Sequence, residues 1–315
     1  MSQGPDYSAV LLAQDRVAPY VHRTPVLTSL VIDDALGAKL AFKCENFQKV
    51  GAFKARGAHN AVFSLSDEEA KRGVVTHSSG NHGAALALAA RTRGIPCWVV
   101  VPENALASKV ASIRRYGATV VLCPPTQAGR ETTCARIQAE TGAHMVHPYN
   151  DPAVIAGQGT AALELMDQVE GLEVIITPVG GGGLLSGTSL AAKGRNPAIQ
   201  VFGAEPAGAD DAARSLAAGH LIPQTGPNTL ADGLRSSLGD LTFAIIQQNV
   251  TAVITVTEPQ LLAAMRELWE VLKIVVGPSS AVAYAAVKFS PDRFKGKRVG
   301  VVLTGGNVDL DKPIW

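Results

Sequence analysis

The chain alternates between short apolar runs rich in β-branched residues and longer stretches with the spacing of helices. The short runs predict strands over residues 74–76, 97–101, 119–122, 174–177, 199–204, 253–256 and 299–304. Helices are predicted between them, over residues 83–93, 109–116, 130–141 and 157–169. Because the strands are apolar at successive positions and tight hairpin signals are absent, the pattern favours parallel sheets covered on both faces by helices.

The length of the chain extends this prediction to two domains. A chain of 315 residues exceeds what one compact core usually holds. We therefore predict an α/β fold of two packed domains, each with a twisted, mostly parallel sheet flanked by helices. Residues 1–70 and 150–315 are expected to form the large domain, and residues 71–149 the small one.

Composition and charge narrow the class of partner. Hydrophobic residues make up 47% of the chain and charged residues 17%, which suits a folded globule and not a disordered chain. The net charge is +1 and like charges form no run, so a nucleic acid or an anionic membrane surface is not expected as a partner. A small molecule is the expected partner.

The cysteines and the apolar stretches bear on location. The four cysteines lie far apart without a CxxC pair, and the chain does not start with a basic segment followed by a long apolar one. No stretch approaches eighteen unbroken apolar residues, so no membrane span is predicted. We expect a cytoplasmic protein with reduced thiols.

A run of four glycines, Gly180 to Gly183, lies between a predicted strand and a predicted helix. Bare backbone N–H groups at a helix start can bind an anion the size of a phosphate. A tight strand-to-helix turn is the alternative, although one or two glycines suffice for it. The dinucleotide fingerprint GxGxxG is not met, because Leu185 or Ser186 takes the place of its third glycine, and GxxxxGK[ST] is absent. The phosphate is therefore expected to belong to another cofactor.

Two further segments could carry chemistry. Residues 78–83, Ser-Ser-Gly-Asn-His-Gly, again join a strand to a helix, and their hydroxyl, amide and N–H groups suit a carboxylate. Ordinary helix capping by Ser and Asn is the alternative. In the second segment Lys54 follows Phe53 and lies near a second cation, Arg56. A desolvated lysine near positive charge has a lowered pKa and can form a Schiff base, whereas most lysines are solvated on the surface.

Several of these motifs together resemble a known family. Residues 43–58, 78–83, 180–184 and 304–308 occur in the order and spacing of the fold-type II pyridoxal-phosphate enzymes. Within that group the chain is similar to the serine racemase, threonine dehydratase and threo-3-hydroxyaspartate ammonia-lyase family, over nearly its whole length. The motifs are specific for the cofactor and the fold, and much less specific for the substrate.

The resemblance implies how pyridoxal 5'-phosphate is held. Lys54 carries the cofactor covalently, Phe53 packs near its ring, Asn81 binds its phenolic oxygen and Thr304 faces its pyridine nitrogen. A neutral hydroxyl at that nitrogen makes the ring a weaker electron sink, which favours prompt loss of a β-hydroxyl over transamination. The phosphate is held by Gly180, Gly181, Gly182, Gly183 and Leu184.

The resemblance also implies a reaction. Lys54 removes the Cα proton of 3-hydroxyaspartate, serine or threonine, and loss of the β-hydroxyl yields a 2-keto acid and ammonia. Arg130 lies where serine racemases place an arginine that can reach a second carboxylate, with an ordinary helix-surface arginine as the alternative. The residues expected to contact the substrate are Ser78, Ser79, Asn81, His82, Arg130 and Ser237.

A divalent cation is implied as well. The carboxylates of Glu205 and Asp211 with the Ala209 carbonyl, completed by waters, match the cation site of serine racemases. Magnesium or manganese is expected there, with calcium as a third candidate. Without the resemblance, acidic residues in a loop are usually just solvated. The family likeness further suggests a homodimer.

Two alternatives and two departures qualify the assignment. An amino-acid racemase with side dehydratase activity would use the same residues, with Ser79 as a second catalytic base beside Lys54. A non-catalytic amino-acid or cofactor-binding protein is the second alternative, which Lys54 disfavours because a sensor needs no covalent anchor. Ala52 stands where many relatives carry serine and Gly277 where many carry glutamate, so the detailed substrate preference does not transfer.

Overall fold

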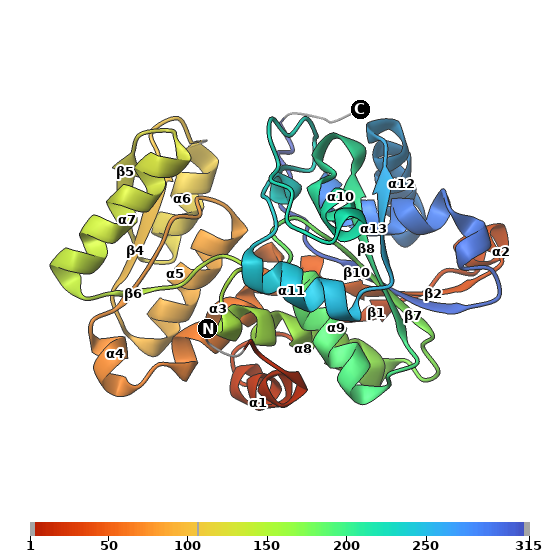
Figure 1. The fold of residues 1–315 in the computed structure, drawn as a ribbon, viewed down its shortest axis with the longest axis horizontal. Helices are drawn as coiled ribbons and strands as arrows, with labels where there is room; N and C mark the ends of the chain where they lie inside the picture. The colour runs from red at the N-terminus through yellow and green to blue at the C-terminus, as the bar shows by residue number, and fades with distance from the viewer. Residues whose placement is uncertain (1–3, 106, 312–315) are drawn as a thin grey trace.

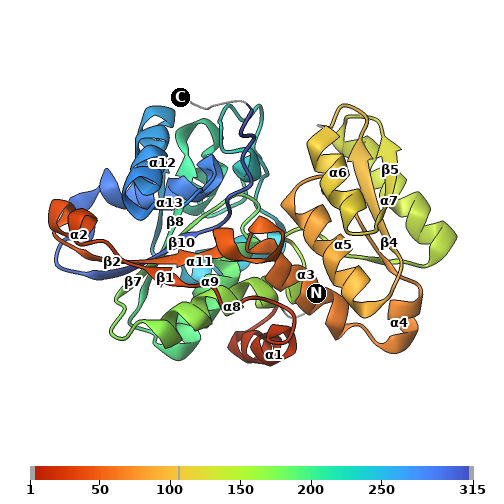
Figure 2. The same cartoon turned by 180° about the vertical axis from the view of Figure 1, so that it is seen from behind.

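The computed structural model describes residues 4–105 and 107–311 (Figure 1). Two sheets organise the chain: one has six strands in the order β1-β2-β10-β7-β8-β9, and the other has four in the order β5-β4-β3-β6. The sheets lie toward opposite ends of the long axis in both views, with α3 (Lys54–Ser64) between them (Figure 2). Helix α3 packs against α8 (Pro152–Gln168), which lies beside the six-stranded sheet, and against α5 (Asn81–Arg93), which lies beside the four-stranded sheet.

The six-stranded sheet is parallel except for the β1–β2 pair. Alternate side chains of its strands point to opposite faces, so Val174 and Ile176 enter one core and Ile175 the other. Helices α12 and α13 contribute to the first core, and α1, α8, α9 and α11 to the second. Its strands are β1 (Val26–Leu27), β2 (Lys39–Cys44), β7 (Val174–Pro178), β8 (Gln200–Pro206), β9 (Ala252–Val256) and β10 (Arg298–Leu303). The remaining elements beside it are α1 (Tyr7–Val17), α2 (Leu30–Leu36), α9 (Gly183–Arg195), α10 (Asp211–Ala218), α11 (Asp240–Asn249), α12 (Glu258–Leu272) and α13 (Pro278–Lys288).

The four-stranded sheet is parallel throughout. Buried residues of α3 and α5 pack on one face, and buried residues of α7 on the other. All four strands lie within residues 71–149, the range predicted for the small domain. They are β3 (Val74–Thr76), β4 (Cys97–Pro102), β5 (Thr119–Cys123) and β6 (His144–Met145), and the accompanying helices are α4 (Asp67–Lys71), α6 (Ala107–Arg115) and α7 (Gln127–Thr141).

The predicted α/β class is confirmed, and each predicted strand is present to within two residues. The sequence pattern missed β1, β2 and β6. Two of them are only two residues long, and β2 contains Lys43, which is fully buried because it pairs with Glu164 at 2.8 Å. No helix in the described part of the chain is both long and apolar enough to cross a bilayer.

Candidate functional site

The glycine loop, residues 180–185, follows β7 and opens α9. Among the described residues, its six backbone N–H groups donate no hydrogen bond, while the N–H groups on either side of it do. Gly182 caps the helix with a φ of 89°, which an L side chain rarely adopts. Six free donors at the N-terminus of a 13-residue helix suit an anion such as phosphate.

Close packing also requires glycine in this loop. A Cβ atom on Gly181 would lie 2.3 Å from Cγ of Tyr149, and one on Gly183 would lie 3.0 Å from Cα of the same tyrosine. A Cβ atom on Gly180 would lie 3.0 Å from the carbonyl oxygen of Gly233. Packing therefore supports the alternative that the glycines serve a tight strand-to-helix turn more than the sequence suggested. A tight turn does not, however, account for the free N–H groups.

A second loop with free donors joins β3 to α5. In the described part of the chain the N–H groups of residues 79–83 donate no hydrogen bond. The helix is capped by Gly80 without a side-chain hydrogen bond, so Ser78 and Ser79 do not act as caps. Both serines are half-buried. These free hydroxyl and N–H groups suit the carboxylate of an amino acid.

Lys54 is the first residue of α3 and is partly buried. Its Nζ donates a hydrogen bond to the carbonyl of Pro148 (2.7 Å) and lies 5.1 Å from the centre of the Phe53 ring. Burial lowers the pKa of this amine to about 8. A larger share of the amine is therefore neutral near pH 7 than for an exposed lysine, which suits a nucleophile and a base.

Arg56 does not lower the pKa of Lys54, contrary to the sequence-based prediction. Its guanidinium is fully buried and pairs with Glu45 and Glu164, each at 2.8 Å. The carboxylates neutralise its charge, so burial and not this neighbouring cation lowers the pKa of Lys54. The ion pairs fix the first turn of α3 against α8 and the segment after β2.

The end of β10 lies against the residue before Lys54. The N–H of Phe53 donates to the Thr304 carbonyl (3.0 Å), and Thr304 is buried. Ala52 and Gly277, which depart from the family pattern, both contact Gly305, the residue after Thr304. Ala52 forms a β-bridge with Gly305, and the Gly277 N–H donates to the Gly305 carbonyl (3.0 Å). A Cβ atom on Gly277 would meet no atom closer than 3.5 Å, so this position has room for a side chain.

Asn81 and His82 begin α5. The side-chain carbonyl of Asn81 accepts a hydrogen bond from Asn307 Nδ2 (3.0 Å). His82 is buried and its Nε2 donates to the Val146 carbonyl (3.3 Å), while Nδ1 has no partner among the described residues. Burial and the nearby Lys54 lower the pKa of His82 well below its usual range, so the ring is neutral. The donor that His82 offers to a carboxylate is therefore its backbone N–H.

Sequence reasoning missed a segment that crosses the site, His147 to Tyr149. The rings of His77, His147 and Tyr149 contact one another in that order, edge to face. The centroids of the His77 and His147 rings are 5.3 Å apart, and those of the His147 and Tyr149 rings are 4.6 Å apart. Burial lowers the pKa of His147 to about 4 and also lowers that of His77. These residues have no motif of their own, and only the contacts of Pro148 with Lys54 and of Tyr149 with the glycine loop reveal them.

Arg130 and Ser237 have different surroundings. Arg130 is partly buried on α7, its Nε has no partner among the described residues, and its charge contributes to the lowered pKa of His77. The hydroxyl of Ser237 accepts a hydrogen bond from the N–H of Gln224 (2.9 Å). Arg130 therefore has a free donor near the aromatic segment, whereas Ser237 is engaged with a neighbouring loop.

Two carboxylates are buried between β8 and α10. Glu205 accepts from the N–H groups of Ala212 (3.3 Å) and Ala213 (2.7 Å), and Asp211 accepts from that of Leu238 (3.1 Å). Burial raises the pKa of Glu205 to about 8 and that of Asp211 to about 6, and the charge of Asp211 adds to the first shift. Neither forms an ion pair among the described residues, and no three His, Cys, Asp or Glu side chains converge there or elsewhere in that part of the chain.

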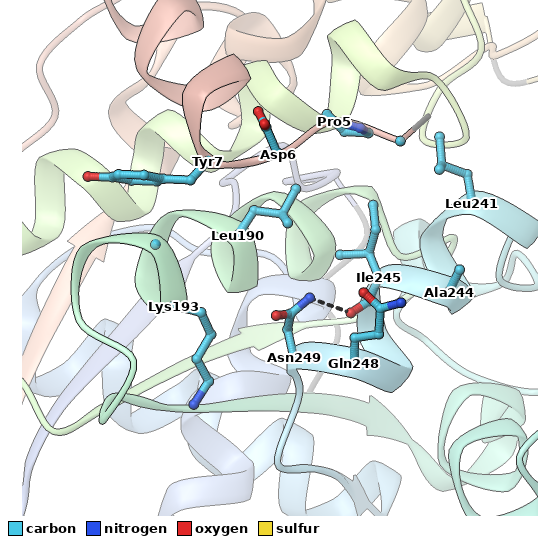
Figure 3. A pocket seen from close by; sticks show the side chains of 12 residues that line it. Pro5, Asp6, Tyr7, Leu190, Lys193, Leu241, Ala244, Ile245, Gln248 and Asn249 are labelled. Carbon is cyan, nitrogen blue, oxygen red and sulfur yellow. Dashed lines mark hydrogen bonds between the residues drawn. The ribbon is translucent and has the colours of Figure 1, made fainter. Parts of the chain in front are cut away.

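A separate pocket of about 480 Å³ lies between the N-terminal segment, α9 and α11. Figure 3 shows Tyr7, Leu190 and Ile245 on its sides. None of the predicted site residues lines it.

Known proteins resemble the chain over almost its full length. Residues 17–305 match the family described as pyridoxal-phosphate dependent enzyme. The chain is 51% identical over 311 residues to a beta-hydroxyaspartate dehydratase of Paracoccus denitrificans, covering 99% of both chains. It is 44% identical over 309 residues to an L-threo-3-hydroxyaspartate ammonia-lyase of Saccharomyces cerevisiae, covering 98% of this chain and 95% of the relative. The crystal structure of a serine racemase from Dictyostelium discoideum superposes with a TM-score of 0.94 at 50% identity, covering 97% of this chain and 99% of that one.

Proposed function

Because the chain belongs to the pyridoxal-phosphate-dependent enzyme family, we propose that it removes water and then ammonia from a β-hydroxy-α-amino acid, giving a 2-keto acid. The observation that carries the proposal is the position of Lys54. Its amine, with a pKa of about 8, is fixed at the start of α3, and two loops of free N–H donors begin α5 and α9. One loop suits the cofactor phosphate and the other suits the substrate carboxylate.

We assign the cofactor contacts to residues that fit it. Lys54 would hold pyridoxal phosphate covalently, and the N–H groups of residues 180–185, Leu184 included, would bind its phosphate. Phe53, Asn81 and Thr304 would surround its ring. When bound, the cofactor withdraws electrons from Cα, and the neutral Thr304 hydroxyl makes that withdrawal weaker than a carboxylate would.

The remaining steps of the proposed reaction, proton removal and substrate orientation, fall to different residues of the chain. The neutral Lys54 amine removes the Cα proton, and the 79–83 loop with the Ser78 hydroxyl orients the substrate carboxylate. The buried His82 and His147 stay neutral near pH 7, so neither places a positive charge beside the Lys54 amine. Loss of the β-hydroxyl as water leaves an unsaturated amine, which hydrolyses to the keto acid and ammonia.

We propose 3-hydroxyaspartate as the preferred substrate, with serine and threonine as weaker ones. The unpartnered Nε of Arg130 would bind the second carboxylate. The Paracoccus and Saccharomyces relatives are named for hydroxyaspartate, which supports this choice. The test incubates purified protein with each amino acid and measures keto acid and ammonia together. Equimolar products, formed fastest from 3-hydroxyaspartate, are expected, and no product from any of the three would contradict the proposal.

Racemisation is a second candidate function, favoured by the similarity to serine racemases. It needs an acid–base group on each side of Cα, and Ser79 in the loop of free donors would supply the second. Ser79→Ala should then remove exchange between enantiomers while elimination from one enantiomer continues. Chiral chromatography of serine and aspartate measures this. If the unaltered protein never forms the opposite enantiomer, racemisation is excluded.

We also propose a divalent cation at Glu205 and Asp211. Two buried carboxylates without a cationic partner repel each other, and an ion bound by them, the Ala209 carbonyl and waters would remove that cost. Magnesium, manganese and calcium all accept such oxygen ligands. The ion would stabilise the fold, because nothing in the reaction requires it to contact the substrate.

Finally, we propose a homodimer in the cytoplasm. Phe47 and Val275 are 48% and 44% exposed, and Asn46 joins their segments by donating to the Val275 carbonyl (3.2 Å). Exposed apolar side chains on two joined segments favour burial against another chain, here a second copy. All four cysteines are free and buried, which suits a reducing compartment. Light scattering of the purified protein tests the dimer, and a monomer mass would contradict it.

A further inference from the structure

Tyr149 covers the glycine loop that we assign to the cofactor phosphate. Its ring lies directly over Gly181, where an added Cβ atom would be 2.3 Å from both Cγ and Cδ1 of the tyrosine. The backbone of Tyr149 also lies close to Gly183, with its Cα atom 3.0 Å from the position of an added Cβ atom. Tyr149 is therefore part of the wall of the proposed anion site.

The same segment reaches the lysine. The carbonyl of Pro148, the preceding residue, accepts the hydrogen bond from Lys54 Nζ at 2.7 Å. The His147 ring meets the Tyr149 ring edge to face at 4.6 Å and 88°, which limits rotation of the phenol ring. Residues Pro148 and Tyr149 thus contact the two groups that define the proposed site: Pro148 contacts Lys54, and Tyr149 contacts the glycine loop.

The phenol is free to donate a proton. Within the described residues the only hydrogen bond that Tyr149 donates comes from its backbone N–H, to His147 Nδ1 (3.4 Å), and the side chain is half-buried. Burial raises the pKa of the Tyr149 phenol above its ordinary value of about 10, so the phenol stays protonated near pH 7. It is a much stronger acid than the serine hydroxyls of the 78–83 loop, and the Nε2–H of His82 is already bound to Val146.

Hydroxide is a poor leaving group, so the dehydration needs a proton donor at the β-oxygen. Building on the proposed function, we propose that Tyr149 is a catalytic residue that donates its phenol proton to the departing β-hydroxyl. Lys54 takes the Cα proton, the Cα electron pair forms the Cα–Cβ double bond, and the Cβ–O bond breaks with its electrons on oxygen. The Tyr149 proton completes the water molecule. The phenolate then recovers a proton from the Lys54 ammonium, so both side chains return to their initial state.

The test compares leaving groups in Tyr149→Phe, which keeps the ring on Gly181 and removes only the hydroxyl. Chloride leaves without a proton, so β-chloroalanine should bypass the missing donor. We expect kcat for serine and 3-hydroxyaspartate to fall by about 100- to 10,000-fold, while kcat for β-chloroalanine stays within about threefold. The visible absorption of bound cofactor should not change. Tyr20→Phe, which removes a hydroxyl from a ring stacked on Phe63, should match the unaltered protein on all substrates.

Three results would overturn the proposal. Equal losses on hydroxy and chloro substrates would mean that Tyr149 only supports the loop, and undiminished dehydration by Tyr149→Phe would mean that another group donates. If the unaltered protein releases keto acid from β-chloroalanine but from no hydroxy amino acid, the proposed dehydration itself fails. The last result is separated from the others because it appears before any substitution is made.

Discussion

Lys54 is the residue on which the proposed chemistry depends, and its pKa gives a testable pH dependence. With a pKa of about 8, about a tenth of the amine is neutral at pH 7 and about nine tenths at pH 9. Only the neutral amine attacks an aldehyde, so the rate at which cofactor-free protein attaches pyridoxal phosphate should rise with pH and level off above about 8. Stopped-flow absorbance measures this rate. A midpoint near 10.5, the ordinary value for lysine, would contradict the effect of burial.

Arg130 tests substrate selection. Loss of a charge-assisted pair to the second carboxylate should lower kcat/KM of Arg130→Ala for 3-hydroxyaspartate by about 10- to 100-fold, and should change that for serine only slightly. Arg136→Ala is the matched control, because Arg136 lies on the same helix and is paired at the surface with Glu140. Equal losses for both substrates in Arg130→Ala would remove Arg130 from the specificity site.

At the scale of single residues, local motifs made part of the site predictable. Lys54 and the two loops of free donors could be located because glycine and serine at a strand–helix junction leave backbone N–H groups free. The partner of Lys54, the Pro148 carbonyl, lies 94 residues away in the sequence, and Tyr149 meets Gly181 through tertiary packing alone. No short-range pattern specifies such contacts.

Among the elements, α9 depends on the conformation of its first turn. Gly182 has a φ of 89°, and an added Cβ atom would lie 2.8 Å from Thr242. Gly182→Ala should therefore shift the N–H groups of the loop and weaken pyridoxal-phosphate binding by at least about tenfold. Gly94→Ala is the control, because Gly94 also has a positive φ of 74° but has no atom nearby and lies at the far end of α5. Equal cofactor affinity in both variants would show that the loop does not hold the phosphate.

The start of α3 illustrates what could not be predicted for an element. The sequence suggested that Arg56 lowers the pKa of Lys54, but Arg56 is buried between Glu45 and Glu164, which neutralise it. Those carboxylates come from two other segments, so the pairing depends on the tertiary fold. The network fixes the helix turn that carries Lys54 and acts on the lysine through geometry and not through charge.

For the whole molecule, the proposed cation site predicts a response of the melting temperature to chelation. An ion bound to the buried Glu205 and Asp211 stabilises only the folded chain, so a chelator should lower the melting temperature and added magnesium should restore it. Differential scanning calorimetry makes the measurement. Glu205→Gln should abolish the response. An unchanged melting temperature, together with metal-free protein as purified, would exclude the site.

The family and the fold class were predictable because separated motifs agree, and both predictions are confirmed. The alternation of apolar runs predicted the parallel sheets because side chains on both faces of β3 and β7 are buried. The antiparallel β1 was missed because a strand of two residues has no periodicity to recognise.

The central claim is that pyridoxal phosphate is attached to Lys54, and peptide mapping tests it most directly. The purified holoprotein is reduced with borohydride, digested with a protease and analysed by mass spectrometry for the lysine that carries the reduced cofactor. The account predicts that the label is found on Lys54 and is absent from Lys54→Ala. A label on another lysine, or no label in protein that still forms keto acid, would contradict it.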